Sequence, residues 1–285
     1  MKIVERIYGL FNGKTKLDKV EHWAGKAGSE FASLLFARFM APQSAPNVHN
    51  KVLRMSSAGH PCLRKLWFKH RPWTDHEELA PVTQIKFMYG DLIEVLVIFL
   101  MRIAGIKVDD QQRRVDYDLP NGWKVKGSLD LSVGGKVIDV KSVAPFSMKK
   151  FESGDFGDDP FGYVSQLSLY RDAGKYTEGA WLAVDKVSGA LVECPLKSAP
   201  TREDDLVHIT DAIESPIPVV RGANATVVKE GPNCKLCTMC SYCEYKDVCY
   251  EDANGGKGLR KFIYSKGPVW LTDVKKLPRV AEVKT

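Results

Sequence analysis

The sequence lacks any apolar run long enough to cross a bilayer. Its most apolar stretch, "LIEVLVIFLM" at residues 92–101, contains Glu94 and is shorter than the roughly 20 residues that a transmembrane helix needs. We also find no signal-peptide pattern, no internal repeat and no long low-complexity segment. We therefore expect a soluble cytoplasmic protein without a membrane partner, in which residues 92–101 form a buried helix.

A strong excess of one charge is also absent. The 285 residues have a formal net charge of +6, and 44% are hydrophobic and 27% charged, which is typical of a soluble globular chain. The basic residues concentrate, with aromatic residues among them, at 51–73 and 257–285. Because cations neutralise phosphates and aromatic rings stack on bases, these segments favour nucleic-acid binding, with solvated basic loops as the alternative. The predicted DNA contacts are Arg64, Lys65, Lys69 and Arg71.

Residues 125–142, "VKGSLDLSVGGKVIDVKS", predict a hairpin with an acidic face. Apolar residues alternate with polar ones on both sides of Gly134 and Gly135, which indicates two half-buried strands joined by a two-residue turn. Counting outward from the turn, the expected pairs are Leu131 with Ile138, Asp130 with Asp139, and Ser128 with Lys141.

The two facing aspartates predict a metal site. Two aspartates directly across an antiparallel pair have Cβ atoms about 5 Å apart, where like charges destabilise a sheet unless a cation lies between them. Mg²⁺ suits this position because it takes oxygen ligands and keeps places for water and phosphate. Lys141 shares the face of Asp139 and is placed to orient an attacking water. A solvent-exposed face with an Asp139–Lys141 ion pair is the alternative.

The cysteines are clustered. Five of the seven lie within "CKLCTMCSYCEYKDVC" at residues 234–249, while Cys62 and Cys194 stand apart. An intracellular chain rarely keeps disulfides, so clustered thiols indicate a metal or an iron-sulfur cluster. Zinc would suit four local thiols, whereas Cys240, Cys243 and Cys249 would need a fourth ligand such as Cys62. Cys194, at the end of an apolar strand, is expected to be a small buried hydrophobe.

Taken together, these motifs resemble the PD-(D/E)XK nuclease superfamily, in its RecB-like branch. Asp130 and the segment "IDVKS", with Asp139 and Lys141, look like the D…DxK core. "YVSQLSLYRDA" supplies Gln166 and Tyr170, which match the QxxxY motif and share one helix face. Upstream, "YGDLIEVLVIFLMRIAG" is similar to the first-motif helix, with Glu94 where the branch often has His.

The cysteines are similar to those of one subset of this branch, which includes the AddB nuclease domain and the CRISPR-associated exonucleases. That subset carries a four-cysteine iron-sulfur site with one ligand before the core and three after it. The resemblance implies a structural 4Fe-4S cluster, with Zn²⁺ as the alternative, and its implied ligands are Cys62, Cys240, Cys243 and Cys249. Cys234 and Cys237 are extra to the pattern.

The implied fold is α/β: a restriction-endonuclease-like core with a mixed β-sheet flanked by helices, and a cysteine-rich C-terminal segment tied back to the N-terminal part. Four segments are predicted in chain order. They are a helical N-terminal segment at 1–50, the nuclease core at 51–230, the cluster-binding segment at 231–252, and a basic C-terminal tail at 253–285.

The implied activity is hydrolysis of DNA phosphodiester bonds by metal-activated water, leaving 5′-phosphates. Glu94, Asp130, Asp139 and the main-chain carbonyl of Val140 would hold Mg²⁺ or Mn²⁺, and Lys141 would hold the attacking water. Gln166 and Tyr170 would position DNA or the metal ligands. The resemblance favours an exonuclease of recombination, repair or DNA processing, including viral enzymes of the host cytoplasm. A recombination or replication protein, or further copies of the chain, would be its partners.

Two other classes of function fit part of the sequence. A non-catalytic, zinc-containing nucleic-acid-binding module would account for the basic segments and the cysteines, but it leaves the facing aspartates unexplained. A metal-dependent phosphoesterase for small molecules would account for the aspartates, but it does not need the basic aromatic segments.

Overall fold

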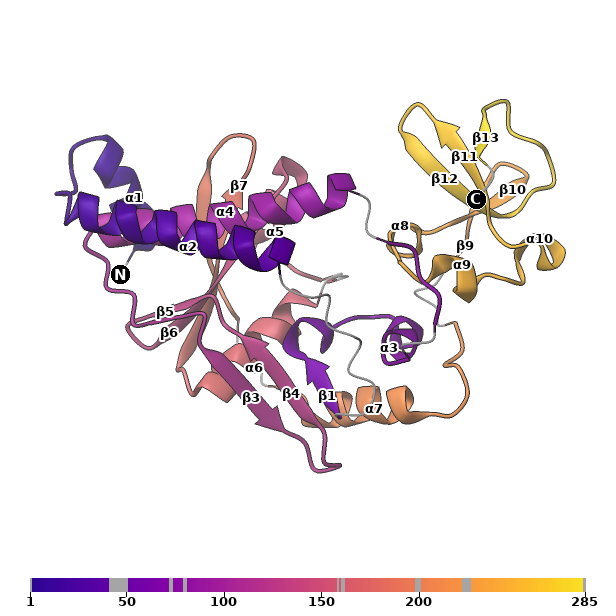
Figure 1. The fold of residues 1–285 in the computed structure, drawn as a ribbon, viewed down its shortest axis with the longest axis horizontal. Coiled ribbons are helices and arrows are strands. Elements are labelled where there is room, and N and C mark those ends of the chain that lie inside the picture. Colours follow the sequence, from indigo (N-terminus) through magenta and orange to yellow (C-terminus); the bar gives the residue numbers. More distant parts are fainter. Residues whose placement is uncertain are drawn as a thin grey trace. The chain divides into compact units, whose positions relative to one another are not determined.

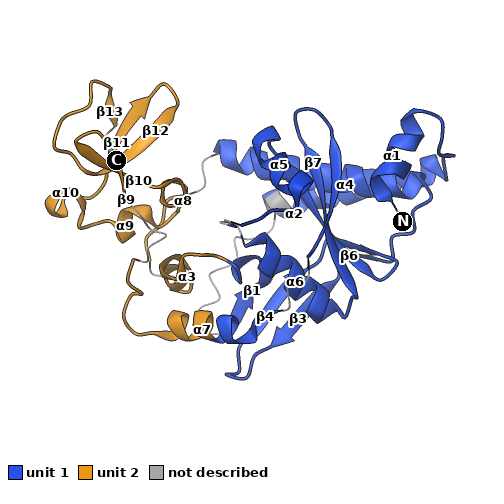
Figure 2. Ribbon diagram, turned by 180° about the vertical axis from the view of Figure 1, so that it is seen from behind, with its two compact units in different colours: residues 1–44, 51–59, 81–207 blue, residues 45–50, 60–80, 208–285 orange. Residues whose placement is uncertain are grey.

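The computed structural model describes residues 2–40, 51–71, 74–78, 81–157, 159, 162–197, 201–221 and 227–283. The chain forms two compact units, shown in blue and orange in Figure 2. Unit 1 comprises residues 1–44, 51–59 and 81–207, and unit 2 comprises residues 45–50, 60–80 and 208–285. The predicted α/β class, with mixed sheets flanked by helices, is confirmed.

The main sheet of unit 1 has five strands in the order β2-β5-β6-β7-β8. Only the β6–β7 pair is parallel, as expected where helices connect two strands, and the other pairs are antiparallel. The predicted hairpin is β5–β6, and its Leu131–Ile138 register is confirmed. The strands are β2 (Asp110–Gln111), β5 (Leu131–Val133), β6 (Lys136–Val143), β7 (Glu178–Asp185) and β8 (Leu191–Pro195).

The hairpin is shorter than predicted. The first predicted strand is interrupted after Ser128, and residues before the break belong to another sheet, of order β1-β4-β3. Ser128 pairs with Arg114 of β3, so the predicted pairing of Ser128 with Lys141 is wrong. The strands of this sheet are β1 (Val52–Arg54), β3 (Arg114–Asp118) and β4 (Lys124–Ser128).

Helices cover the main sheet of unit 1. α1 (Ile3–Phe11) and α4 (Pro81–Ile103) pack their apolar side chains onto β5, β6 and β7, and α2 (Val20–Met40) lies along α4 (Figure 1). The core contains fully buried Ile7, Met101 and Ile138, because α4 places apolar residues toward the sheet at helical spacing. Between β6 and β7 lie α5 (Pro145–Ser153) and α6 (Tyr163–Gly174).

The N-terminal helices therefore do not stand apart from the predicted nuclease core. The loop "PQSAPNVHN" predicted within residues 1–50 lies outside the described residues. The helix expected over 92–101 is confirmed as part of α4, although Leu92 and Leu96 are exposed. Among the residues that the structure describes, no helix is both long and apolar enough to span a membrane.

Unit 2 combines the Cys62 segment with the C-terminal part of the chain. It contains α3 (Leu63–Lys69), the C-terminal half of α7 (Glu203–Glu214), and three short helices, α8 (Thr238–Ser241), α9 (Lys246–Cys249) and α10 (Ala253–Gly256). Its antiparallel sheet has the order β13-β11-β12-β10-β9, and all of its strands come from residues after 226. They are β9 (Val227–Glu230), β10 (Asn233–Leu236), β11 (Arg260–Tyr264), β12 (Gly267–Asp273) and β13 (Glu282–Val283).

Two predicted boundaries differ from this organisation. Residues 253–283 are a folded part of unit 2 and not a basic tail, because β11 and β12 form a hairpin whose Phe262 and Leu271 are buried. The Cys62 segment, predicted at the start of the nuclease core, belongs to unit 2. The cysteine-rich segment and the segment that was expected to supply its fourth thiol therefore share one unit.

Candidate active site

Two predicted catalytic residues of β6 lie beside Asp130: Asp139 is buried and Lys141 is half-buried. Asp139 is 2% exposed, and its Oδ2 atom lies 2.6 Å from Nζ of Lys141. Asp130 follows the break after β4, and its Oδ2 accepts a hydrogen bond of 2.8 Å from the backbone N–H of Val140. This bond holds the Asp130 carboxylate at the strand that carries Asp139 and Lys141. The predicted use of the Val140 carbonyl as a metal ligand stays a prediction.

Glu94 of α4 faces the same carboxylates. Its Oε1 accepts a hydrogen bond of 2.6 Å from the side-chain amide of Gln112. The other end of that amide accepts a bond of 3.1 Å from the Ser128 hydroxyl. Gln112 thus links α4 to β4, and it has a left-handed backbone conformation (φ +49°), which is unusual for a residue with a Cβ atom. No sequence signal marked Gln112, because it belongs to no recognised motif and precedes the hairpin.

The motif residues of α6 join the site through Lys141. The Lys141 ammonium donates to Oε1 of Gln166 at 3.4 Å, and Nε2 of Gln166 donates to the Tyr170 hydroxyl at 3.3 Å. Tyr170 is 5% exposed, and its ring packs so closely on Gly127 that a Cβ atom there would lie 2.7 Å from Cε1. The structure therefore brings together the two helix residues and the strand lysine that the sequence motifs singled out.

Tyr163 is a further neighbour that the sequence did not mark. The Lys141 ammonium lies 5.1 Å from the centroid of its ring, within the range of a cation–π interaction. Burial raises the pKa of the Tyr163 hydroxyl, so this group stays protonated at neutral pH. Its spacing of three residues before Gln166 on α6 is the only sequence signal that could have found it.

The electrostatics of the site show unbalanced negative charge. Burial raises the pKa of Asp130 well above its usual range, and the charges of Asp139 and Glu94 raise it further. Burial also raises the pKa of Glu94, against the hydrogen bond from Gln112, and Asp139 adds to the rise. Burial acts to lower the pKa of Lys141, but the carboxylates of Asp139 and Asp130 outweigh it and raise the pKa above its ordinary value. Lys141 is therefore a fixed cation.

These groups fit a hard divalent cation by chemistry and charge. Carboxylate oxygens are the ligands that Mg²⁺ and Mn²⁺ prefer, and one lysine does not neutralise three acids. Across the part of the chain that the structure describes, no group of three or more His, Cys, Asp or Glu side chains is already gathered around a possible ion position. Binding would therefore require the carboxylates of Asp130, Asp139 and Glu94 to turn toward one another.

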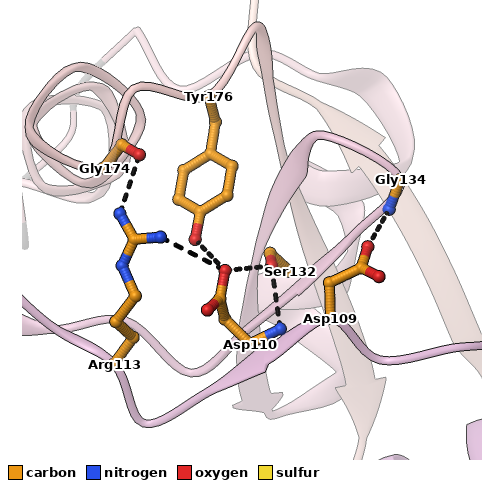
Figure 3. A network of polar contacts seen from close by, with 7 residues as sticks. All are labelled: Asp109, Asp110, Arg113, Ser132, Gly134, Gly174 and Tyr176. Atoms are coloured by element: carbon orange, nitrogen blue, oxygen red, sulfur yellow. Dashed lines mark hydrogen bonds and ion pairs between the residues drawn. The ribbon is translucent and has the colours of Figure 1, made fainter.

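The opposite, turn end of the β5–β6 hairpin carries a second acidic cluster with a different character (Figure 3). Oδ2 of Asp110 accepts hydrogen bonds from the hydroxyls of Tyr176 (2.6 Å) and Ser132 (3.0 Å). It also pairs with Arg113 at 3.3 Å, while Arg113 donates to the carbonyl of Gly174 at 2.8 Å. These donors, Tyr176 first, lower the pKa of Asp110. The cluster joins β2 and β5 to the end of α6.

In unit 2 the thiol of Cys62 is an electrostatic neighbour of Cys240, Cys243 and Cys249, the other three predicted cluster ligands. Burial raises the pKa of Cys240 to about 12 and that of Cys243 to about 11. Cys237 also adjoins Cys240. The thiols are thus near one another, but no three of them are gathered around an ion position in the described residues.

Most of the predicted DNA contacts in and just after α3 have structural roles. Arg71 donates to the backbone carbonyls of Trp67, Ile213 and Ser215, and its guanidinium lies 3.5 Å from the centroid of the Trp67 ring. Trp67 is 8% exposed, so it is not available for base stacking.

The other residues of this segment have similar partners. Arg64 donates to the carbonyl of Val219, and Lys65 pairs with Glu244 at 2.8 Å. Phe68 is buried, and Trp73, which was expected to take part in stacking, lies outside the described residues. Contact of Arg64, Lys65, Lys69 and Arg71 with DNA stays a prediction.

Cys194 is buried at the end of β8, as expected for a small apolar role. It lies in unit 1, apart in the chain from the cysteine-rich segment.

No protein-family model matches this chain, and no curated protein matches it. Several solved structures are similar in part, among them the two that follow. SSO0001 is 13% identical, with 77% of this chain and 91% of that chain covered and a TM-score of 0.43. The alkaline exonuclease LHK-Exo from Laribacter hongkongensis is 11% identical, with 60% and 89% covered and a TM-score of 0.36. Similarity at this level does not assign a function, which must follow from the site itself.

Proposed function

We propose that the chain is a metal-dependent DNA nuclease that hydrolyses phosphodiester bonds at the β6 site. The observation that carries the proposal is the Asp139–Lys141 ion pair beside Asp130 and Glu94, joined through Gln166 to Tyr170. A structural salt bridge would need neither the two extra carboxylates nor the half-buried amide of Gln166 that holds the lysine. Because these residues resemble the D…DxK and QxxxY motifs, we assign the arrangement a catalytic role.

Asp130, Asp139 and Glu94, with the carbonyl of Val140, would hold one or two Mg²⁺ or Mn²⁺ ions. When bound, the ions would supply water activation and neutralise charge that develops on the phosphate. The backbone N–H of Val140 fixes one oxygen of Asp130, so the other oxygen is left to face a ligand.

Lys141 would orient the attacking water and stabilise the developing negative charge on the phosphate oxygens. It would not accept the proton, because its pKa is raised and it stays charged at neutral pH. Gln166 would hold the ammonium in place through its side-chain oxygen, and Tyr170 would orient the Gln166 amide. Both α6 residues would therefore act by positioning.

Several features of the proposal come from the resemblance alone. They are DNA as the substrate, attack at strand ends, a 5′-phosphate product, and a role in recombination, repair or DNA processing with a partner protein or further copies of the chain. The exposed positive charge of unit 2 is compatible with a polyanion, and the proposal includes it as a second DNA contact.

The direct test is digestion of end-labelled linear DNA, single- and double-stranded, beside closed circular DNA, with Mg²⁺, Mn²⁺ or EDTA. We expect metal-dependent loss of linear DNA in the wild type and none with Lys141→Ala. Lys186→Ala, which removes an exposed lysine just after β7, is the matched control and should behave as wild type. Equal digestion by Lys141→Ala and wild type would contradict the proposal.

We further propose that unit 2 holds a 4Fe-4S cluster on Cys62, Cys240, Cys243 and Cys249, with Zn²⁺ as the alternative occupant. The support is that Cys62, which is distant in sequence from the other three thiols, is their neighbour within one unit. Anaerobically purified protein should be brown and contain iron, and Cys62→Ser should lose it while Cys234→Ser keeps it. Colourless protein with stoichiometric zinc would overturn the cluster assignment.

A further inference from the structure

A pocket in unit 1 has no place in the mechanism above. It has a volume of about 390 Å³, within the range of roughly 300–1,000 Å³ that is common for small-ligand sites. It is lined by residues 154–157 and 159, by the start of α6, by β7, and by the end of β8 with the two residues that follow it. Its lining includes Asp155, Phe156, Asp159, Val164, Trp181 and Lys197.

The pocket adjoins the candidate active site on two sides. Trp181 of β7 is the direct partner of Asp139 across the parallel β6–β7 pair, so the two side chains share one face of the sheet. Neighbouring strands lie about 4.8 Å apart, so Trp181, which lines the pocket, is one strand spacing from Asp139 in the sheet. On α6, Val164 follows directly after Tyr163, whose ring lies against Lys141.

The lining suits a flat, polar-edged ring. Phe156 and Trp181 form an aromatic wall with ring centroids 4.4 Å apart. The indole N–H of Trp181 is buried and has no hydrogen-bond partner among the described residues, which leaves a donor unmet beside the pocket.

Charged groups complete the lining at its edge. Asp155 and Asp159 each use one oxygen for a backbone N–H, of Gly157 and Val164 respectively. Each carboxylate keeps an oxygen for a ligand N–H. The exposed Lys197 adds a cation that suits a phosphate next to the ring.

From this lining we infer that the pocket binds the base of the nucleotide next to the scissile phosphate. The inference rests on the proposed function and adds to it a base-binding subsite. A nucleobase offers a face for Phe156 to stack on and edge N–H groups for the carboxylates, and stacking of this kind tolerates different bases. A phosphate bound near Asp139 and Lys141 would place the base of its own nucleotide within reach of the pocket.

The first test uses single-stranded substrates with one abasic nucleotide, moved stepwise past the cleavage position. With the wild-type protein, an abasic nucleotide at one particular position should raise the KM for the DNA about tenfold. Phe156→Ala should raise KM for intact DNA by a similar factor, and the abasic nucleotide should then add nothing, because both changes remove the same contact. Phe146→Ala removes an exposed phenylalanine of α5 that does not line the pocket, so it should keep the wild-type response. An abasic penalty that persists in Phe156→Ala would overturn the inference.

A second test does not depend on cleavage. Strands carrying 2-aminopurine at each position are bound to full-length protein in EDTA, and their emission is followed. Stacking in the pocket should quench one position several-fold in wild type and Phe146→Ala, but not in Phe156→Ala. If one position is quenched but no DNA is digested, base binding in the pocket is supported and the proposed nuclease activity is wrong. If DNA is digested but no position is quenched, the nuclease activity is supported and base binding in the pocket is wrong. Loss of both signals would reject both.

Discussion

The two ends of the β5–β6 hairpin carry acidic clusters that differ in how their charge is satisfied. At the turn end, Asp110 receives two hydroxyl donors and an arginine, and its pKa is lowered. At the far end, burial raises the pKa of Asp130, and the neighbouring Asp139 raises it further. The first cluster is complete without a ligand, whereas the second has more negative charge than its surroundings balance.

This difference indicates a structural role for the cluster at the turn end of the hairpin and a functional role for the cluster at its far end. Buried like charges without compensation are unfavourable, so a chain selected only for stability would replace them or provide donors, as it does around Asp110. Strongly raised carboxylate pKa values beside a charged lysine are the pattern of a functional site. We therefore propose that a cation binds at Asp130 and Asp139, and that Asp110 is part of the scaffold.

The largest expected effect is the loss of nuclease activity in Asp139→Asn. Removing the charge of a proposed metal ligand should lower kcat by about 10³-fold or more, because the metal that activates the water would be lost or displaced. Asp110→Asn is the matched control, because it makes the same chemical change in the other cluster, and it should stay within about twofold of wild type. Equal losses in the two variants would remove the functional distinction between the clusters.

A smaller effect is expected at Tyr163, which packs against Lys141. A cation–π contact at a desolvated site contributes up to about 2 kcal/mol, so Tyr163→Leu should lower kcat by roughly tenfold with KM nearly unchanged. Tyr163→Phe keeps the ring and should remain near wild type. If Tyr163→Phe were as impaired as Tyr163→Leu, the hydroxyl and not the ring would be the important group.

In the metal-free protein, the contribution of Asp130 to stability should decrease as pH rises. Because the folded pKa of Asp130 lies above its unfolded value of about 3.9, its contribution is favourable below that value and is lost as pH rises through the folded pKa. Asp130→Asn keeps an acceptor for the Val140 N–H and removes the charge. At pH 7 in EDTA it should increase the free energy of unfolding by about 1–2 kcal/mol, as measured by urea titration. A decrease would mean that the Asp130 charge is already compensated.

The opposite pH dependence is expected at the turn end. The folded pKa of Asp110 is lowered, so its contribution is present above the unfolded pKa and is lost as pH falls through the folded value. Asp110→Asn should cost about 1 kcal/mol at pH 7, the size of one net hydrogen bond to a charged group at a partly exposed site. The cost should shrink toward pH 3. A cost that does not change with pH would show that shape, not charge, matters there.

Local patterns predicted much of the hairpin and of the site. Gly134 and Gly135 adopt the left-handed conformations (φ +56° and +81°) that a two-residue primed turn requires, so the register next to the turn followed from the sequence. The spacing of Gln166 and Tyr170 placed them on one face of α6, where they are joined by a hydrogen bond.

Features that depend on distant parts of the chain were not predicted. Ser128 was assigned to the hairpin because its alternation continues that of β5, yet its strand pairs with β1 and β3 instead. The basic, aromatic α3 was interpreted as a DNA surface, but the buried faces of Trp67 and Phe68 pack on Tyr245 of the cysteine-rich segment. Composition does not distinguish an amphipathic helix that packs inside a unit from one that binds an external polyanion.

The measurement that most directly tests the central claim is thermal unfolding with and without Mg²⁺ for wild type, Asp130→Asn and Asp110→Asn. A ligand that binds only the folded state raises its stability, by about 2.7 kcal/mol at a concentration of one hundred times Kd. We predict that millimolar Mg²⁺ raises the Tm of wild type and of Asp110→Asn by several degrees and leaves Asp130→Asn unchanged. An equal shift in all three proteins, or none in wild type, would contradict a cation site at the far end of the hairpin.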